Sequence, residues 1–392
     1  METDVNSYRK SFENELDSIL NFWKDNMQDP SGGFYGRMDG HGRIVPDAPK
    51  GAILNARILW TFAAAYRVTG SPEWLALASR AKDYICAHFI DYEFGGAWWS
   101  VNADGTPLDT KKQFYSIAFI VYGMAEHYRA CGDESALEVA KSLYFSIEDH
   151  SRDVENGGYI EASDRFWNPI SDMRLSYKER NDAKTMNTHL HILEAYTALY
   201  RVWKDAGLHN DLRDLVLVFL DRIASPDGHL GLFFDMDWRV QGGRKSFGHE
   251  IEASWLLCEA ADVLGDSDLA DRTRRACMRI AEAAMEGYRP GSGLAYEYNP
   301  ETGVLDEERH WWVQTEAVVG FRNMYSMTSD ARWADAESDV WDYIRRSLIC
   351  PDGEWYWSIL SDGSPNLDED RAGFWKCPYH NGRMCMEMLE RI

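Results

Sequence analysis

Apolar residues recur every three to four positions over several long stretches of the chain, which is the periodicity of a helix with one buried face. The first clear stretch is 53–70, and it ends at Gly70, a residue that readily takes the left-handed conformation after a helix. A second helix is predicted directly after it, with Ser71 as its N-cap and Pro72 at its first helical position. The same pair of helices returns at 114–132 with 133–150 and at 189–207 with 211–225. The repeating unit is therefore two helices.

A short motif of glycine and aromatic residues lies at the start of the turn-rich connection between one pair of helices and the next. Its six copies, in chain order, are GGFYG, GGAWW, GGYIE, GLFFD, GLAYE and GEWYW, at intervals of about 60 residues. Six helical hairpins can form an open solenoid or a closed double ring. A solenoid needs polar capping repeats at both ends, and none is evident. We therefore expect an all-α fold, an (α/α)6 barrel with inner and outer helix rings, built as a single domain over residues 1–392.

The predicted helix at 247–260 carries polar residues on its apolar face. At about 100° per residue, His249 and Glu252 fall in one arc with Leu256, while Glu250 points away. A histidine and a carboxylate on a buried stripe are unusual for a helix that only packs in a core. This mixed face is better explained as the wall of a cavity.

Polar or aromatic residues of similar chemical interest lie near the start of the other five helices that follow the glycine-aromatic motifs. In chain order the six sets are Arg57; Tyr115; Asn187 with His191; His249 with Glu252; Trp312 with Glu316; and His380 after Trp375. If these helices form the inner ring, their six N-termini converge on one mouth of the barrel. Helix N-termini carry partial positive charge, which favours bound or developing anions. The mouth of the barrel is therefore the predicted site.

Composition and charge limit the possible partners. The net charge of −23 argues against nucleic acid and anionic membranes as partners. No apolar run approaches the roughly 18 residues of a membrane span, and the N-terminal segment lacks an apolar signal core. The seven scattered cysteines are typical of free thiols in a cytosolic protein, so we expect a cytoplasmic location. We also expect a monomer. The 16 Trp and 20 Tyr residues either fill a large helical core or line a sugar-binding cleft.

Two histidine motifs invite a metal interpretation, which we do not favour. In HLH at 189–191, residues two apart on a helix point in different directions, so His189 faces away from His191. In HEIE at 249–252, the second histidine of the zinc-protease pattern is absent. We expect no metal. For the other residues a purely structural role stays open. Glu252 and Glu316 would then orient neighbouring side chains, and the aromatic rings would belong to the core.

Four segments carry a resemblance to a known family: NTHLHILEAY, GHEIEASWLL, HWWVQTEAVVGF and FWKCPYHNGRM. Together they resemble the cellobiose 2-epimerase branch of the N-acylglucosamine 2-epimerase superfamily, in the same order and over essentially the whole chain. The resemblance implies an (α/α)6 barrel that reversibly epimerises C2 of the reducing-end sugar of β-1,4-linked disaccharides. Cellobiose would become 4-O-β-glucosyl-mannose and lactose would become epilactose, without metal, nucleotide or other cofactor.

The resemblance also implies roles for particular residues. His249 and His380 resemble the two acid/base residues, and His191 the residue that assists ring opening and closing. Glu252 resembles a residue that supports this chemistry. The residues that resemble the sugar-binding set are Arg57, Tyr115, Asn187, Trp255, Trp311, Trp312, Glu316 and Trp375, the last as the platform for the second sugar.

The residue types agree with this chemistry. A sugar C2 proton becomes acidic only when C1 is an open-chain aldehyde, so ring opening comes first. Proton abstraction then gives an enediolate, whose charge needs fixed donors. Inversion requires a proton to leave one face of C2 and another to arrive on the opposite face, which calls for two acid/base groups. Histidine, with an ordinary pKa of about 6.5, suits this without a large shift.

Three alternatives stay open at this point. A monosaccharide 2-epimerase or an aldose–ketose isomerase would use the same scaffold. A glycoside hydrolase needs two carboxyl groups across the scissile bond, for which Glu252 and Glu316 are the candidates, but it would leave both histidines without a role. A non-catalytic sugar-binding protein would need the aromatic walls but not the acid/base pair.

Overall fold

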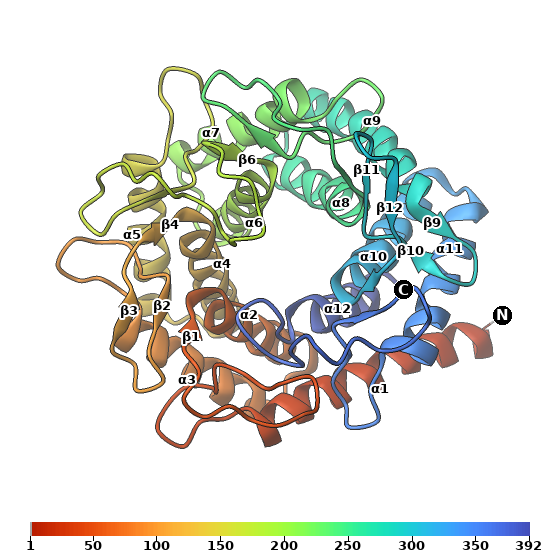
Figure 1. Ribbon diagram of the computed structural model, residues 1–392, viewed down its shortest axis with the longest axis horizontal. Coiled ribbons are helices and arrows are strands. Elements are labelled where there is room, and N and C mark those ends of the chain that lie inside the picture. Colours follow the sequence, from red (N-terminus) through yellow and green to blue (C-terminus); the bar gives the residue numbers. More distant parts are fainter. Residues whose placement is uncertain (1) are drawn as a thin grey trace.

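The protein folds as two concentric rings of helices in a computed structural model that describes residues 2–392 (Figure 1). The inner ring consists of α2 (Ala52–Thr69), α4 (Phe114–Cys131), α6 (Met186–Val202), α8 (Phe247–Leu264), α10 (Trp311–Thr328) and α12 (Tyr379–Arg391). The outer ring consists of α1 (Glu2–Asn26), α3 (Pro72–His88), α5 (Glu134–His150), α7 (Ala206–Val218), α9 (Ser267–Ala284) and α11 (Ala331–Tyr343). Each inner helix packs against the next, and α12 packs against α2, so the inner ring is closed. The predicted (α/α)6 barrel is confirmed.

The two ends of the chain complete the sixth pair of helices. The last inner helix, α12, has no helix after it, and it packs instead against α1 from the N-terminal end. Figure 1 shows the two lying side by side, α1 in red and α12 in blue. Five hairpins are therefore consecutive in sequence, and the sixth is assembled from residues that are more than 350 positions apart.

The burial of each ring follows from its sequence. Every residue of α2 from 52 to 65 is buried, whereas α9 buries only one stripe that includes Leu269, Cys277 and Ile280. Small residues let the inner helices approach closely: a Cβ on Gly123 would lie 2.8 Å from the carbonyl oxygen of Ala56. No helix within residues 2–392 combines the length and the apolar character that crossing a membrane requires.

The predicted helix boundaries at 70–72 agree with the structure. Gly70 has φ of 72° and its N–H donates to the carbonyl of Tyr66, which ends α2 as a left-handed cap. Pro72 begins α3. Ser71 occupies the N-cap position, but its side chain makes no capping hydrogen bond.

The connections between hairpins contain short antiparallel strands, which the sequence analysis described only as turn-rich. These are β1 (Lys50–Gly51), β2 (Ser100–Val101), β3 (Pro107–Asp109), β4 (Lys112–Gln113), β5 (Ala162–Ser163), β6 (Lys184–Thr185), β7 (Phe233–Phe234), β8 (Lys245–Ser246), β9 (Tyr288–Arg289), β10 (Gly293–Leu294), β11 (Glu297–Asn299), β12 (Val304–Asp306), β13 (Arg309–His310) and β14 (Ser358–Ile359). With two or three residues each, they are too short to show alternating polarity. A strand before each of the first five inner helices pairs with a strand of the following connection, which ties neighbouring units together at the mouth.

A buried lysine immediately before the inner helices fixes where they begin. Lys50, Lys112 and Lys184 each pair with an aspartate of their own glycine turn, at N–O distances of 2.6, 2.8 and 2.6 Å. Before α12 the same place is taken by Lys376, which pairs with Glu354 at 2.9 Å. Units four and five depart from this pattern: Lys245, before α8, contacts His229, and Arg309, before α10, donates to backbone carbonyls.

Candidate active site

The N-termini of all six inner helices open into one cavity of about 1090 Å³. The predicted site residues that line it are Arg57, Tyr115, Asn187, His191, His249, Glu252, Trp311, Trp312, Trp375 and His380. Glu316 and Trp255 are not in the lining. They lie behind it, fully buried, where the Trp255 indole N–H donates to Glu316 Oε2 at 3.1 Å. The structure thus brings ten of the twelve predicted residues to the cavity and places the other two in supporting positions.

His380 and His191 each bind a buried carboxylate through Nδ1. The His380 contact is to Glu316 at 2.7 Å, and the His191 contact is to Glu194 at 2.9 Å. A carboxylate can only accept, so Nδ1 carries the proton and the free Nε2 is the nitrogen available to a ligand. Burial outweighs the carboxylates and lowers the pKa of both rings, that of His380 to about 3. Both imidazoles are therefore neutral at pH 7.

His249 has a different partner. Its Nδ1 lies 2.7 Å from the hydroxyl of Ser246, and its ring packs against Trp312 with centroids 4.8 Å apart. Burial, and then the neighbouring His191 and His380, lower its pKa to about 3. The sequence-based expectation of histidines near their ordinary pKa is therefore not what the structure has, because both acid/base candidates lie in a desolvated pocket.

Arg383 connects the carboxylates behind His191 and His380, and it is not among the residues predicted for the site. The guanidinium is 1% exposed and donates to Glu252 and Glu316 at 2.7 Å each. It also pairs with Glu194, the partner of His191. One cation therefore fixes the carboxylates behind both His191 and His380. The available signal was its position three residues after His380, which places both on the same face of α12.

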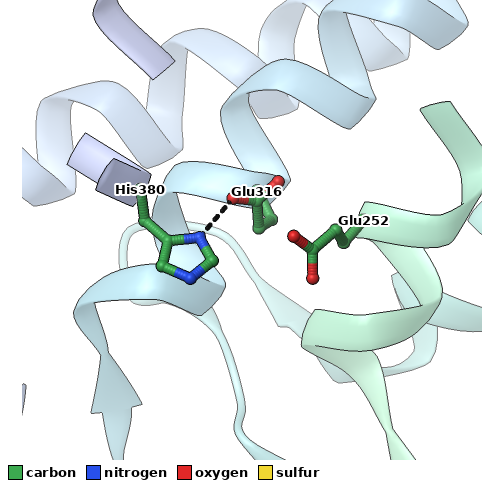
Figure 2. A group of neighbouring side chains, drawn as sticks. All are labelled: Glu252, Glu316 and His380. Atoms are coloured by element: carbon green, nitrogen blue, oxygen red, sulfur yellow. Dashed lines mark hydrogen bonds and ion pairs between the residues drawn. The ribbon is translucent and has the colours of Figure 1, made fainter. Parts of the chain in front are cut away.

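Glu252, Glu316 and His380 come from three inner helices and meet at one point (Figure 2). Burial, and the nearby Glu316, raise the pKa of Glu252 to about 8, whereas Arg383 holds the pKa of Glu316 below its ordinary value despite burial. Ligand atoms of these three residues lie within 4.8 Å of one another, a spacing that a metal ion could use. Two of the three already share the guanidinium of Arg383, so this donor set has a cation of its own.

A donor cluster occupies the opposite wall. Arg57 Nη2 donates to the Tyr115 hydroxyl at 2.9 Å, and Arg57 Nη1 to the backbone carbonyl of Trp375 at 3.2 Å. Burial raises the pKa of Tyr115, which keeps its proton at neutral pH. Since Tyr115 accepts from Arg57, its own O–H remains free to donate. Beside it, the side-chain oxygen of Asn187 is buried and has no partner within residues 2–392.

The outer part of the cavity holds further rings and a crossing contact that the sequence analysis did not identify. Tyr296 and Trp357 line it, and residues 176–180 extend over the mouth from the connection before α6. Lys178 Nζ lies 3.5 Å from Glu369, which belongs to the connection before α12. This contact could not be predicted from the sequence, because its two partners belong to different units.

The other polar residues of this region have structural partners. His189 bonds the carbonyl of Thr185 at 2.6 Å and the N–H of Tyr159 at 2.8 Å, away from the cavity as predicted. Glu250 also points away from the cavity face and binds His229 at 2.8 Å. His229 in turn contacts Lys245 at 2.6 Å, in place of the buried lysine–carboxylate pair of units one, two, three and six.

The chain belongs to the N-acylglucosamine 2-epimerase (GlcNAc 2-epimerase) family, whose model matches residues 33–381. It is an enzyme of the epimerase and isomerase class. It is 53% identical to the cellobiose 2-epimerase of Bacteroides fragilis, over 95% of each chain, and 38% identical to that of Ruminococcus albus, over 96% of each. The solved cellobiose 2-epimerase of Bacillus thermoamylovorans B4167 superposes with a TM-score of 0.94 at 39% identity, covering 99% of this chain and all of the other.

Proposed function

We propose that the protein reversibly epimerises C2 of the reducing-end sugar of β-1,4-linked disaccharides such as cellobiose and lactose. The observation that carries the proposal is a pair of neutral histidines, the partly buried His249 and the buried His380, on two walls of one cavity, with Trp312 packed near both rings. The relatives named cellobiose 2-epimerase, and their coverage of nearly the whole chain, support the same substrate class.

Ring opening is the first step, and His191 is the proposed group for it. It moves a proton between the anomeric hydroxyl and the ring oxygen through Nε2, while Glu194 holds Nδ1 at 2.9 Å. The Glu194 carboxylate stabilises the imidazolium that forms while the proton is in transit. Arg383 holds this carboxylate ionised, since it keeps the pKa of Glu194 low, at about 2, against the effect of burial.

Proton exchange at C2 then follows on the open-chain aldehyde. One histidine removes the C2 proton as a neutral base, and the second histidine, protonated from solvent water, delivers its proton to the other face. The first histidine then returns its proton to solvent. The enediolate between these steps is negative, and Arg57 with the Tyr115 hydroxyl provides fixed donors for it. The same charge favours protonation of a nearby histidine, which offsets the low pKa that burial imposes. Reversal of the two roles runs the reaction backwards.

Trp375 is the proposed platform for the second sugar. It lines the cavity beside the Arg57–Tyr115 pair, and its ring lies 6.2 Å from that of Tyr115 and 6.0 Å from Trp99. A half-exposed indole offers a flat apolar face to a pyranose ring. This feature favours a disaccharide over a monosaccharide as substrate.

The test is incubation with cellobiose and with mannose, separately, in D2O, with products followed by NMR. Expected is inversion at C2 of the reducing-end residue of cellobiose, with deuterium at that carbon and an intact glycosidic bond. Free glucose from cellobiose would instead indicate hydrolysis, and a ketose would indicate an isomerase. Turnover of mannose with none of cellobiose would indicate a monosaccharide enzyme, and no turnover of either a binding protein.

A further inference from the structure

The sequence His-x-x-Glu occurs at the start of two inner helices, but only one of the two histidines binds its glutamate. On α6, His191 binds Glu194 at 2.9 Å. On α8, the motif begins three residues nearer the start of the helix, its carboxylate, Glu252, is held by Arg383 at 2.7 Å, and no hydrogen bond joins that carboxylate to His249. The partner of His249 lies on the other side in sequence, three residues before it.

That partner, Ser246, does not act as an ordinary helix cap. It precedes α8 with extended φ and ψ of −111° and 99°, the position at which a serine hydroxyl usually accepts from a helix N–H. Its hydroxyl makes no such bond and instead lies 2.7 Å from His249 Nδ1. The matching residue of unit three, Thr185, does cap its helix by accepting from the N–H of Thr188 at 3.1 Å. The hydroxyl of Ser246 is thus diverted from the helix to the imidazole.

We propose that Ser246 is a positioning residue that orients His249 and lets it alternate between proton acceptor and proton donor. The hydroxyl both donates and accepts, so it can follow the imidazole through either neutral tautomer and the protonated form. Its backbone is fixed by pairing of β8 with β11, opposite Glu297, and the side chain is 3% exposed. With Trp312 against the ring, the hydroxyl leaves Nε2 as the nitrogen that reaches C2.

The absence of a carboxylate on Nδ1 distinguishes His249 chemically from His191 and His380, whose Nδ1 atoms bind Glu194 and Glu316. The titratable groups that face it are His191 on α6, Glu316 on α10 and His380 on α12. Two of these are histidines, which disfavour a second positive charge. A fixed carboxylate at Nδ1 would favour the imidazolium, whereas a hydroxyl carries no charge and leaves the neutral ring accessible. The inference rests on the proposed function, because it assigns Ser246 to the same proton transfer.

The experiment compares three substitutions with one matched control. Ser246→Ala removes the hydroxyl, Ser246→Thr keeps it in a residue that suits extended backbone, and Ser246→Asp supplies a carboxylate. The control is Ser254→Ala, a fully buried serine on the same helix whose hydroxyl donates to the carbonyl of Ile251 at 2.7 Å, outside the cavity lining. kcat and KM on cellobiose are measured from pH 3 to pH 9, with thermal unfolding at each pH as a check of folding.

Ser246→Ala should lower kcat roughly 10- to 100-fold, as expected for loss of one orienting hydrogen bond, with KM changed less than about threefold. Ser246→Thr should recover most of this loss, and Ser254→Ala should remain near wild type. Ser246→Asp should move the acid limb of kcat/KM to higher pH, because an added carboxylate raises the pKa of the imidazole. Wild-type kcat and pH profile in Ser246→Ala would overturn the inference, as would equal losses in Ser246→Ala and Ser254→Ala.

A second measurement separates this inference from the proposed function. NMR titration of His249 in the substrate-free protein needs no turnover, and Ser246→Asp should raise its pKa by at least about one unit. An unchanged His249 titration overturns the Ser246 contact even where the enzyme is active. An inactive wild type with the expected titration shift overturns the proposed reaction and leaves the contact established.

Discussion

His249 and His380 are the same residue type and lie at the same cavity, on helices separated by α10, yet the protein supports them in different ways. His380 belongs to a charged network, since its Nδ1 binds Glu316 and Glu316 binds Arg383. His249 binds a neutral hydroxyl and a Trp312 ring. Burial lowers the pKa of both rings to about 3. What they share is desolvation, and what differs is the charge behind Nδ1.

This difference shows how one cavity can hold two acid/base groups with unlike tasks. A carboxylate-backed imidazole is better able to carry a proton, and a hydroxyl-backed imidazole is better able to remain neutral. An epimerase needs one histidine in each state at any moment, in either direction. Because the Nδ1 partners of the two histidines differ in charge, the protein itself favours the protonated form of one and the neutral form of the other.

The largest effect is expected from removing either histidine. His249→Ala and His380→Asn should each lower epimerisation roughly 10²- to 10⁴-fold, because general acid–base catalysis contributes that much. Supplying each epimer separately in D2O shows which histidine acts on which epimer. The remaining histidine should still exchange C2–H of one epimer, and the two variants should retain exchange with opposite epimers. Near-normal turnover in either variant would remove that residue from the mechanism.

Arg383→Met tests the charged half of the comparison. The substitution leaves two ionised buried carboxylates, Glu194 and Glu316, without their shared cation and removes the hydrogen-bond donor to Glu252. Breaking a buried ion pair costs about 3–5 kcal/mol, so the free energy of unfolding should fall by about that amount and turnover should be lost. Arg391→Met on the same helix is the control, since Arg391 is partly exposed and should cost less. Equal losses of stability in the two variants would contradict a special role for the Arg383 network.

Much of this site could be predicted from the sequence, because the repeat places one polar set at each inner helix start. Periodicity put His249 on the cavity face and Glu250 on the other, and both placements agree with the structure. The partners of these residues could not be predicted. The same motif, His-x-x-Glu, occurs on α6 and α8, but on α8 its glutamate, Glu252, accepts a hydrogen bond from Arg383 of a third helix. The local sequence of α8 contains no sign of this partner.

The same limit explains the other differences between prediction and structure. Trp255 and Glu316 share the spacing of lining residues, yet their side chains meet each other behind the wall. The ring itself closes by pairing α1 with α12, the two helices farthest apart in sequence. Long-range partners depend on how the units are arranged in space, whereas the sequence pattern reports each unit separately.

Acid titration tests what the two histidines share. In the folded protein both have a pKa of about 3, against about 6.5 when unfolded, so between these values only the unfolded chain takes up the protons. Stability is therefore full above about pH 6.5 and falls as the pH decreases towards 3. His249→Gln and His380→Gln should each reduce the loss of unfolding free energy between pH 7 and pH 4.5 by about 2 kcal/mol. Urea unfolding at the two pH values measures this.

The control for that titration is His41→Gln at an exposed position, which should leave the difference between the two pH values as in wild type. If only one of the two site variants reduces the loss, desolvation is not common to both histidines. The two histidines would then differ mainly in their burial rather than in their Nδ1 partner.

The smallest effect is expected at Glu252, and it separates the two carboxylates that Arg383 joins. A pKa of about 8 means that Glu252 carries a proton at pH 7, so the neutral, isosteric Glu252→Gln should keep kcat on cellobiose within about fivefold there. Glu316 is ionised, and Glu316→Gln should cost roughly 10- to 100-fold because it removes the charge behind His380. Above pH 8 wild type should lose activity as Glu252 ionises, and Glu252→Gln should not. Equal losses in the two glutamine variants at pH 7 would mean that Glu252 acts as a carboxylate, and that the α8 wall is as charged as the α12 wall.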